Sequence, residues 1–153
     1  MNKNCILSLF VAVAFFSCQK KEIAATTNFD CVNAQFDNAP TLGEASSRIV
    51  GKWQLKKMAA MRIQTELPNI RLVFSANKTV EVYQNEQLIQ QDKYQLIENQ
   101  QGTTRLIALE TTKTTFQNGD YSFLRGTVRV CDAELLIDNG MAFDAPGYFF
   151  FKQ

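Results

Sequence analysis

The sequence predicts an all-β fold, namely an antiparallel up-and-down barrel of about eight strands that follows a signal peptide and a short N-terminal tether. Short stretches in which apolar and polar residues alternate recur from residue 51 to the end, with Asn, Gly and Pro between them. No helical period is long enough for a crossover helix, so neighbouring strands should pair antiparallel. Closing the sheet removes its exposed edges. A two-sheet sandwich is the alternative.

The predicted strands are short and evenly spaced. The fourth stretch fits either one strand or a pair of strands, and the polar residues 111–120 form the longest predicted loop of the domain. The strands cover residues 52–61, 70–74, 79–82, 88–97, 105–110, 121–130, 135–137 and 147–152.

Alternation also predicts which side chains point into the barrel, because successive residues of a strand face opposite sides of the sheet. A slip of one residue would turn a strand's whole set outward, so each strand is a separate test. The predicted inward set is Trp53, Leu55, Leu72, Phe74, Val80, Val82, Tyr94, Leu96, Tyr121, Phe123, Val128, Val130, Tyr148 and Phe150.

Residues 1–17 have the features of a secretory signal peptide. Lys3 gives a short positive start, and an apolar run occupies residues 5–16 before a small residue. The run is too short to span a bilayer as a helix, which takes about 20 residues.

The Ser17-Cys18 junction resembles the lipobox of bacterial lipoproteins. This resemblance implies that Cys18 is acylated, becomes the new N-terminus and holds the chain at a membrane. Gln19, in place of Asp, favours the outer membrane of the cell envelope by the same resemblance. Several acyl chains anchor firmly, because each buried CH₂ contributes about 0.8 kcal/mol. The alternative is a secreted protein cut near Ser17, with Cys18 free.

Composition excludes several classes of function. Without residues 1–17, whose only charge is Lys3, the chain keeps 15 basic and 15 acidic side chains. This balance, with no basic stripe, argues against a nucleic-acid partner. The chain has no histidine, which excludes Ser-His-Asp and Cys-His nucleophiles and His-ligated zinc. We expect no enzyme activity and no cofactor, although a carboxylate pair is not excluded by composition.

Two cysteines remain after the signal peptide and the lipid attachment site are set aside. Cys31 and Cys131 are expected to form a disulfide in an oxidising compartment. Such a bridge would fasten a tether, residues 18–47, onto the barrel domain, residues 48–153. Two separate buried thiols are the alternative.

Several stretches resemble bacterial lipocalin-like domain lipoproteins. Gly51-Lys52-Trp53 is similar to the Gly-x-Trp that opens lipocalin barrels, and residues 72–80, 94–96 and 147–152 resemble their second hairpin, middle strand and aromatic closing strand. The resemblance implies that Trp53 lies at the barrel base with a basic residue packed over it, here Lys152 in place of the usual Arg. It further implies a small apolar ligand without identifying it.

Arg125 is the unusual residue of the predicted sixth strand. Strict alternation places it on the face of Tyr121 and Phe123, where it could pair with a ligand carboxylate or phosphate, and Tyr94 is a further candidate ligand contact. The alternative places Leu124 inside and Arg125 on the surface, with a bulge at the following glycine.

Two further patterns have simple explanations. Asp120, Asp132, Glu134 and Asp138 are the kind of oxygen ligands that calcium prefers, but they match no calcium loop, so we expect no metal. Residues 148–151 are aromatic on both faces. They are expected to be mainly core, and the outer face is expected to be covered by the N-terminal segment or a partner.

The sequence therefore favours a lipid-anchored, non-enzymatic envelope protein that holds a small apolar or amphipathic ligand in the barrel mouth. The alternative is a filled barrel that serves as a structural or protein-interaction module of an envelope complex. Large side chains in every interior layer would favour the second.

Overall fold

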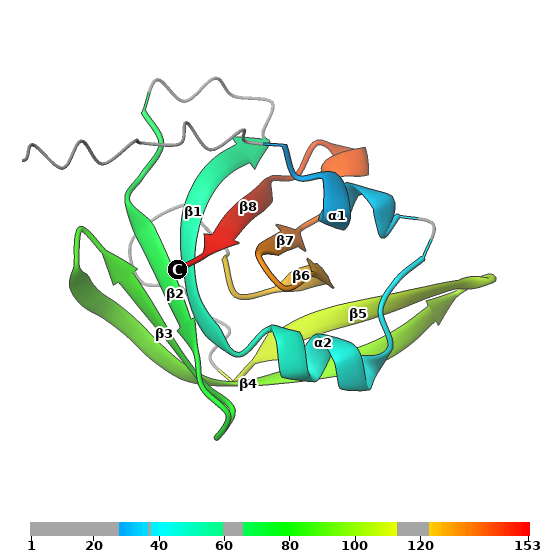
Figure 1. The fold of residues 1–153 in the computed structure, drawn as a ribbon, viewed down its shortest axis with the longest axis horizontal. Helices are drawn as coiled ribbons and strands as arrows, with labels where there is room; N and C mark the ends of the chain where they lie inside the picture. The colour runs from blue at the N-terminus through cyan, green and yellow to red at the C-terminus, as the bar shows by residue number, and fades with distance from the viewer. Residues whose placement is uncertain (1–27, 37, 60–65, 113–122) are drawn as a thin grey trace, which may run out of the picture.

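The computed structural model describes residues 28–36, 38–59, 66–112 and 123–153. Within them, eight strands form a closed barrel in which each strand pairs antiparallel with its neighbours in sequence, and β8 pairs with β1 (Figure 1). This confirms the predicted up-and-down barrel and excludes the two-sheet sandwich. The strands are β1 (Gly51–Ala59), β2 (Ile70–Phe74), β3 (Thr79–Gln84), β4 (Gln87–Gln101), β5 (Thr104–Thr111), β6 (Gly126–Val130), β7 (Glu134–Asp138) and β8 (Gly147–Lys152).

Strand β4 is a single long strand, which resolves the two alternatives left open for this stretch. Its first half pairs with β3 up to Lys93 opposite Thr79, and its second half pairs with β5 from Tyr94 opposite Thr111. The far half of β4 and the start of β5 therefore extend beyond the rest of the barrel as a long hairpin (Figure 1).

The barrel has two different ends. At the end that we call the base, β1 begins beside the end of β8. Helix α2 (Leu42–Arg48) packs against the interior there through Ala45, and Ile49, which directly follows the helix, is buried beside it. Thr41 and Glu44 form a capping box at the start of α2, which fixes where the chain turns into the helix. At the opposite end, which we call the mouth, β1, β3, β5 and β7 end and β2, β4, β6 and β8 begin.

The interior contains the side chains that alternation places there. Every described member of the predicted inward set belongs to the main core cluster, with Leu96 only partly buried; Tyr121 lies outside the described residues. The largest fully buried side chains of this cluster are Trp53, Phe74, Tyr148 and Phe150.

A second apolar cluster lies on the outer face of the barrel. Helix α1 (Asp30–Ala34) packs against β7 there (Figure 1), and Phe29, directly before the helix, covers β8. Phe29 stacks on Phe151 with ring centroids 4.5 Å apart and lies 4.9 Å from the ring of Phe149. The N-terminal segment is thus what covers this outward-facing aromatic surface. Among the described residues, no helix has the length and apolar character to cross a membrane.

Candidate functional site

The base of the barrel is organised around Trp53. Its indole Nε1 donates a hydrogen bond to the carbonyl oxygen of Ile49 at 2.7 Å, and the ring is fully buried. The ammonium of Lys152 lies 5.0 Å from the ring centroid and donates to the carbonyl oxygen of Arg48 at 3.1 Å. Gly51 makes this possible, because a Cβ at that position would lie 2.6 Å from Cε of Lys152. These contacts make the base a closed, cation-capped end of the barrel.

Aromatic side chains fill the middle of the barrel. The ring of Phe74 meets that of Tyr94 edge to face at 5.0 Å, and Phe123 meets Tyr148 in the same way at 4.8 Å. The hydroxyl of Tyr94 donates to the carbonyl oxygen of Ser75 at 3.3 Å, and burial raises the pKa of this phenol. Two of the candidate ligand contacts, Tyr94 and Phe123, are therefore packed core residues, and the third, Tyr121, lies outside the described residues.

Of the two alternatives left open for Arg125, the structure supports the second, in which Leu124 is inside and Arg125 lies on the surface, so Arg125 does not face a ligand with Tyr121 and Phe123. Strand β6 begins only at Gly126, whose φ of +121° breaks the alternation. As a result the neighbours Phe123 and Leu124 are both buried, and Arg125 is exposed. A Cβ at Gly126 would lie 2.5 Å from the carbonyl oxygen of Asp138, so this turn requires glycine.

Polar side chains on β4 also face the interior, and sequence reasoning missed them. Asp92 is only 6 % exposed, and its carboxylate accepts hydrogen bonds from the backbone N–H of Lys93 and from the hydroxyl of Thr112. Gln90 lies opposite Val82, one period from Asp92. Extending the period-two count back from Tyr94 would have found both positions.

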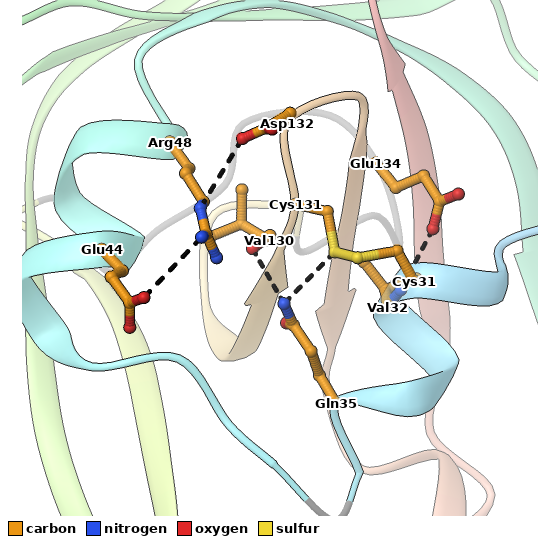
Figure 2. Close-up of a disulfide and its surroundings, with 9 residues drawn as sticks. All are labelled: Cys31, Val32, Gln35, Glu44, Arg48, Val130, Cys131, Asp132 and Glu134. Carbon is orange, nitrogen blue, oxygen red and sulfur yellow. Dashed lines mark hydrogen bonds and ion pairs between the residues drawn. A yellow bond between two sulfur atoms is a disulfide. The ribbon is translucent and has the colours of Figure 1, made fainter.

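The predicted disulfide is present and joins α1 to the turn between β6 and β7. Cys31 and Cys131 are bonded, with Cα atoms 6.4 Å apart. Figure 2 shows the surrounding polar groups: Gln35 donates through Nε2 to the sulfur of Cys131 at 3.2 Å and to a backbone carbonyl. The backbone N–H of Val32 donates to the carboxylate of Glu134 at 3.0 Å. The tether is thus fastened by a covalent bond and by polar contacts on both sides of it.

A buried cation, Arg129, lies two residues before Cys131 in the sequence. The guanidinium of Arg129 lies 3.5 Å from the ring centroid of Phe36 and 3.5 Å from a carboxylate oxygen of Asp138. Burial lowers the pKa of Arg129, and the neighbouring carboxylate opposes this shift. Its position between Val128 and Val130 on an outward face is visible in the sequence, but its cover is not, because Phe36 comes from the distant N-terminal segment.

Of the four acidic residues considered for calcium, the three that the structure describes do not converge. Asp132 is exposed and pairs with Arg48 at 3.6 Å, Glu134 holds α1, and Asp138 pairs with Arg129; Asp120 lies outside the described residues. Among the described residues, the one group of three possible metal ligands is Cys31, Cys131 and Glu134. Its two sulfurs are bonded to each other, so this group does not offer two thiolates.

A shallow hollow of about 250 Å³ lies where β4 passes from β3 to β5. The ammonium of Lys93 donates to the hydroxyl of Thr79 at 3.0 Å, and Glu110 accepts from Gln95 at 3.2 Å. These charged groups therefore have partners within the sheet, and the hollow offers no converging set of reactive groups.

Comparison with known proteins identifies no relative. No family model, no curated protein and no solved structure matches this chain.

Proposed function

We propose that this chain is a lipid-anchored, non-enzymatic, lipocalin-like protein of the cell envelope that acts as a filled-barrel interaction module. The observation that carries the proposal is the packed interior. Trp53 and α2 close the base, and the edge-to-face aromatic pairs occupy the middle layers. A barrel of about eight strands has an interior just wide enough to be filled by side chains or to hold one small ligand. The described interior side chains form one continuous core cluster, which supports a filled barrel.

The mouth supplies a surface for a partner. Leu88 and Ile89, at the start of β4, are each 51 % exposed, and Leu67, just before β2, is 43 % exposed. Tyr83 pairs with Leu88 and Val82 pairs with Gln90, so Ile89 is a bulge residue without a cross-strand partner. Bulges at sheet ends redirect side chains, and consecutive exposed apolar residues are suited to a protein contact.

Native mass spectrometry of the protein purified from its own host in a mild detergent tests the filled barrel. We expect the mass of the acylated chain with one disulfide, alone or with a protein partner. A tightly retained additional molecule of lipid size would contradict the proposal. A Leu88→Asp and Ile89→Asp double variant should lose the partner, whereas the control Gln95→Asp, on the exposed face of the same strand, should keep it.

Ligand carriage is the second candidate, and one observation favours it. The inward face of β4 becomes polar toward the mouth, at Asp92 and Gln90, as in a site that orients an amphipathic ligand. Asp92→Asn should then reduce retention of the additional mass in the same measurement.

Anchoring is tested separately. Replacing Cys18 with Ala should release the protein from membranes, because acylation needs the thiol. Unchanged membrane partition and unchanged precursor processing would overturn the lipoprotein part of the proposal and leave the filled barrel to its own test.

A further inference from the structure

The two sulfurs of the disulfide have unequal surroundings. Cys31, in α1, is exposed, whereas Cys131, which directly follows β6, is only 6 % exposed. A thiol arriving from solvent therefore reaches Cys31 more easily than Cys131. Access is one of the factors that decide which sulfur of a disulfide is attacked.

The hydrogen bonds of Gln35 also favour attack at Cys31, with Cys131 as the leaving sulfur. Gln35 directs Nε2 at the sulfur of Cys131, at 3.2 Å, and the same nitrogen is fixed in place by the carbonyl oxygen of Val130 at 3.1 Å (Figure 2). When the S–S bond breaks, the departing sulfur carries a negative charge, and an N–H donor stabilises that charge. A leaving thiol whose thiolate is stabilised leaves faster. Cys131 is thus prepared as the leaving sulfur and Cys31 as the attacked one.

We propose that Cys31 is a site of thiol–disulfide exchange with a dithiol reductant. A thiolate of the reductant attacks the sulfur of Cys31, a new S–S bond forms there, and the Cys31–Cys131 bond breaks. Cys131 departs with the electron pair as a thiolate that Gln35 holds. The second thiolate of the reductant then attacks the reductant's first sulfur, which is bonded to Cys31 in the mixed disulfide. An S–S bond forms within the reductant, which is thereby oxidised, and Cys31 is released as a thiolate. The inference depends on the disulfide alone and not on the proposed function.

Exchange at this site loosens the cover on the outer face. Helix α1 has five residues, too few to persist without tertiary contacts. After reduction the segment is held by the Val32–Glu134 and Gln35–Val130 hydrogen bonds and by the rings of Phe29 and Phe36, contacts that are non-covalent and can open. Opening uncovers Leu136 and Phe149, which the segment buries in the oxidised protein.

Glu134 regulates the rate and not the choice of sulfur. Its carboxylate oxygen lies within 4.8 Å of both sulfurs. A negative charge at that distance opposes the approach of a thiolate to either one. Glu134→Gln should therefore speed reduction without changing which cysteine carries the adduct.

Trapping the mixed disulfide tests the assignment. The full chain with Cys5→Ala and Cys18→Ala, which keeps only the two bonded cysteines, is treated briefly with reduced glutathione, a monothiol that cannot complete the second step. The reaction is quenched with acid, free thiols are alkylated and the peptides are mapped. We expect glutathione on Cys31 and the alkyl group on Cys131, by about tenfold over the reverse. Equal labelling, the reverse pattern, or reduction only in denaturant would overturn the proposal.

The role of Gln35 is tested by rate. Gln35→Leu removes the donor and should slow formation of the adduct by about two- to tenfold, the range of one net hydrogen bond. If Gln35 only held α1 in place, its loss would loosen the segment and speed reduction, so the two roles predict opposite signs. Gln95→Leu, on the exposed face of β4, is the matched control and should leave the rate unchanged. A faster or unchanged rate for Gln35→Leu would refute the leaving-group assignment.

Discussion

The inside of the barrel and the outer face of β7 and β8 are both apolar and both buried, but in different ways. Inside, eight strands supply side chains at every second position, and the cluster closes on itself. Outside, Leu136 and Phe149 are covered by one short helix from far away in the sequence, held by a disulfide and a few contacts. The interior is therefore a property of the strands, whereas the outer cover depends on where the tether is fastened.

Removing the disulfide should have the largest effect and should act on the outer cover. The bond joins positions 100 residues apart, and the chain-entropy model gives about 4–5 kcal/mol for a loop of that length. A Cys31→Ser and Cys131→Ser double variant should lose about that much free energy of unfolding in urea titrations followed by circular dichroism.

The same double variant can show whether the interior depends on the outer cover, because the single tryptophan, Trp53, reports on the interior. Fluorescence from Trp53, buried at the base, should stay blue-shifted before unfolding, while limited proteolysis should begin in residues 28–36. A red-shifted native spectrum would show that the interior also depends on the cover.

Trp53→Ala acts on the interior instead. It should cost about 3–5 kcal/mol, because it empties a fully buried position and removes the ring beneath Lys152. Thermal and urea unfolding followed by circular dichroism measure the loss, and proteolysis of α1 in the native state should not increase. Lys152→Met, which keeps the stem but not the charge, is the control and should cost much less. A cost for Trp53→Ala below that of Lys152→Met would contradict the closed base.

This contrast explains what could be predicted from the sequence. Alternation is a local pattern. The strands, the burial of Trp53 and the inward set could therefore be predicted without knowing which residues pack against them. The disulfide could be proposed because Cys31 and Cys131 were the remaining thiols. The cover of Phe36 over Arg129 could not be predicted, because it pairs residues from segments far apart in sequence with no shared pattern.

One open alternative and one omission have local causes. Strict alternation through Arg125 assumed a strand where the chain makes a turn, and the structure supports the alternative in which Gly126 interrupts the strand. Asp92 was missed because a carboxylate was not expected inside, although its position follows from Tyr94. For Asp92 the pattern was present, and an assumption about residue type was preferred to it; for Arg125 the pattern alone could not decide between the two alternatives.

Thr41→Ala should have a moderate effect at the base. It removes the side chain that accepts the backbone N–H of Glu44 at 3.2 Å, and loss of an N-cap costs about 1 kcal/mol. Urea unfolding measures the change, and Thr41→Ser is the control that should retain most of the stability. Equal losses for Ala and Ser would show that the methyl group matters more than the cap.

The same capping box predicts a pH dependence. Hydrogen bonds from the backbone N–H and hydroxyl of Thr41, with Arg48 nearby, hold the pKa of Glu44 below its usual value of 4.5. A lowered folded-state pKa stabilises above the unfolded value and the gain is lost as the pH falls through the folded value. Glu44→Gln should therefore be less stable than the parent at pH 7 and approach it below about pH 4.5. A constant difference across this range would refute the assignment.

Replacing Arg125 should have the smallest effect, and comparison with Arg129 makes it informative. Both lie within a few residues of the start of β6, but Arg125 is exposed, whereas Arg129 is 8 % exposed and lies between Phe36 and Asp138. Arg125→Ala should change the free energy of unfolding by no more than about 0.5 kcal/mol, as is usual for exposed positions. Arg129→Ala should cost more, because it leaves the half-buried carboxylate of Asp138 without its cation and uncovers the ring of Phe36. Urea unfolding of the two variants side by side checks the order. If Arg125→Ala were the costlier change, or stabilised the protein as removal of a lone buried cation would, the exposed position of Arg125 would be wrong and a ligand role inside the barrel would return.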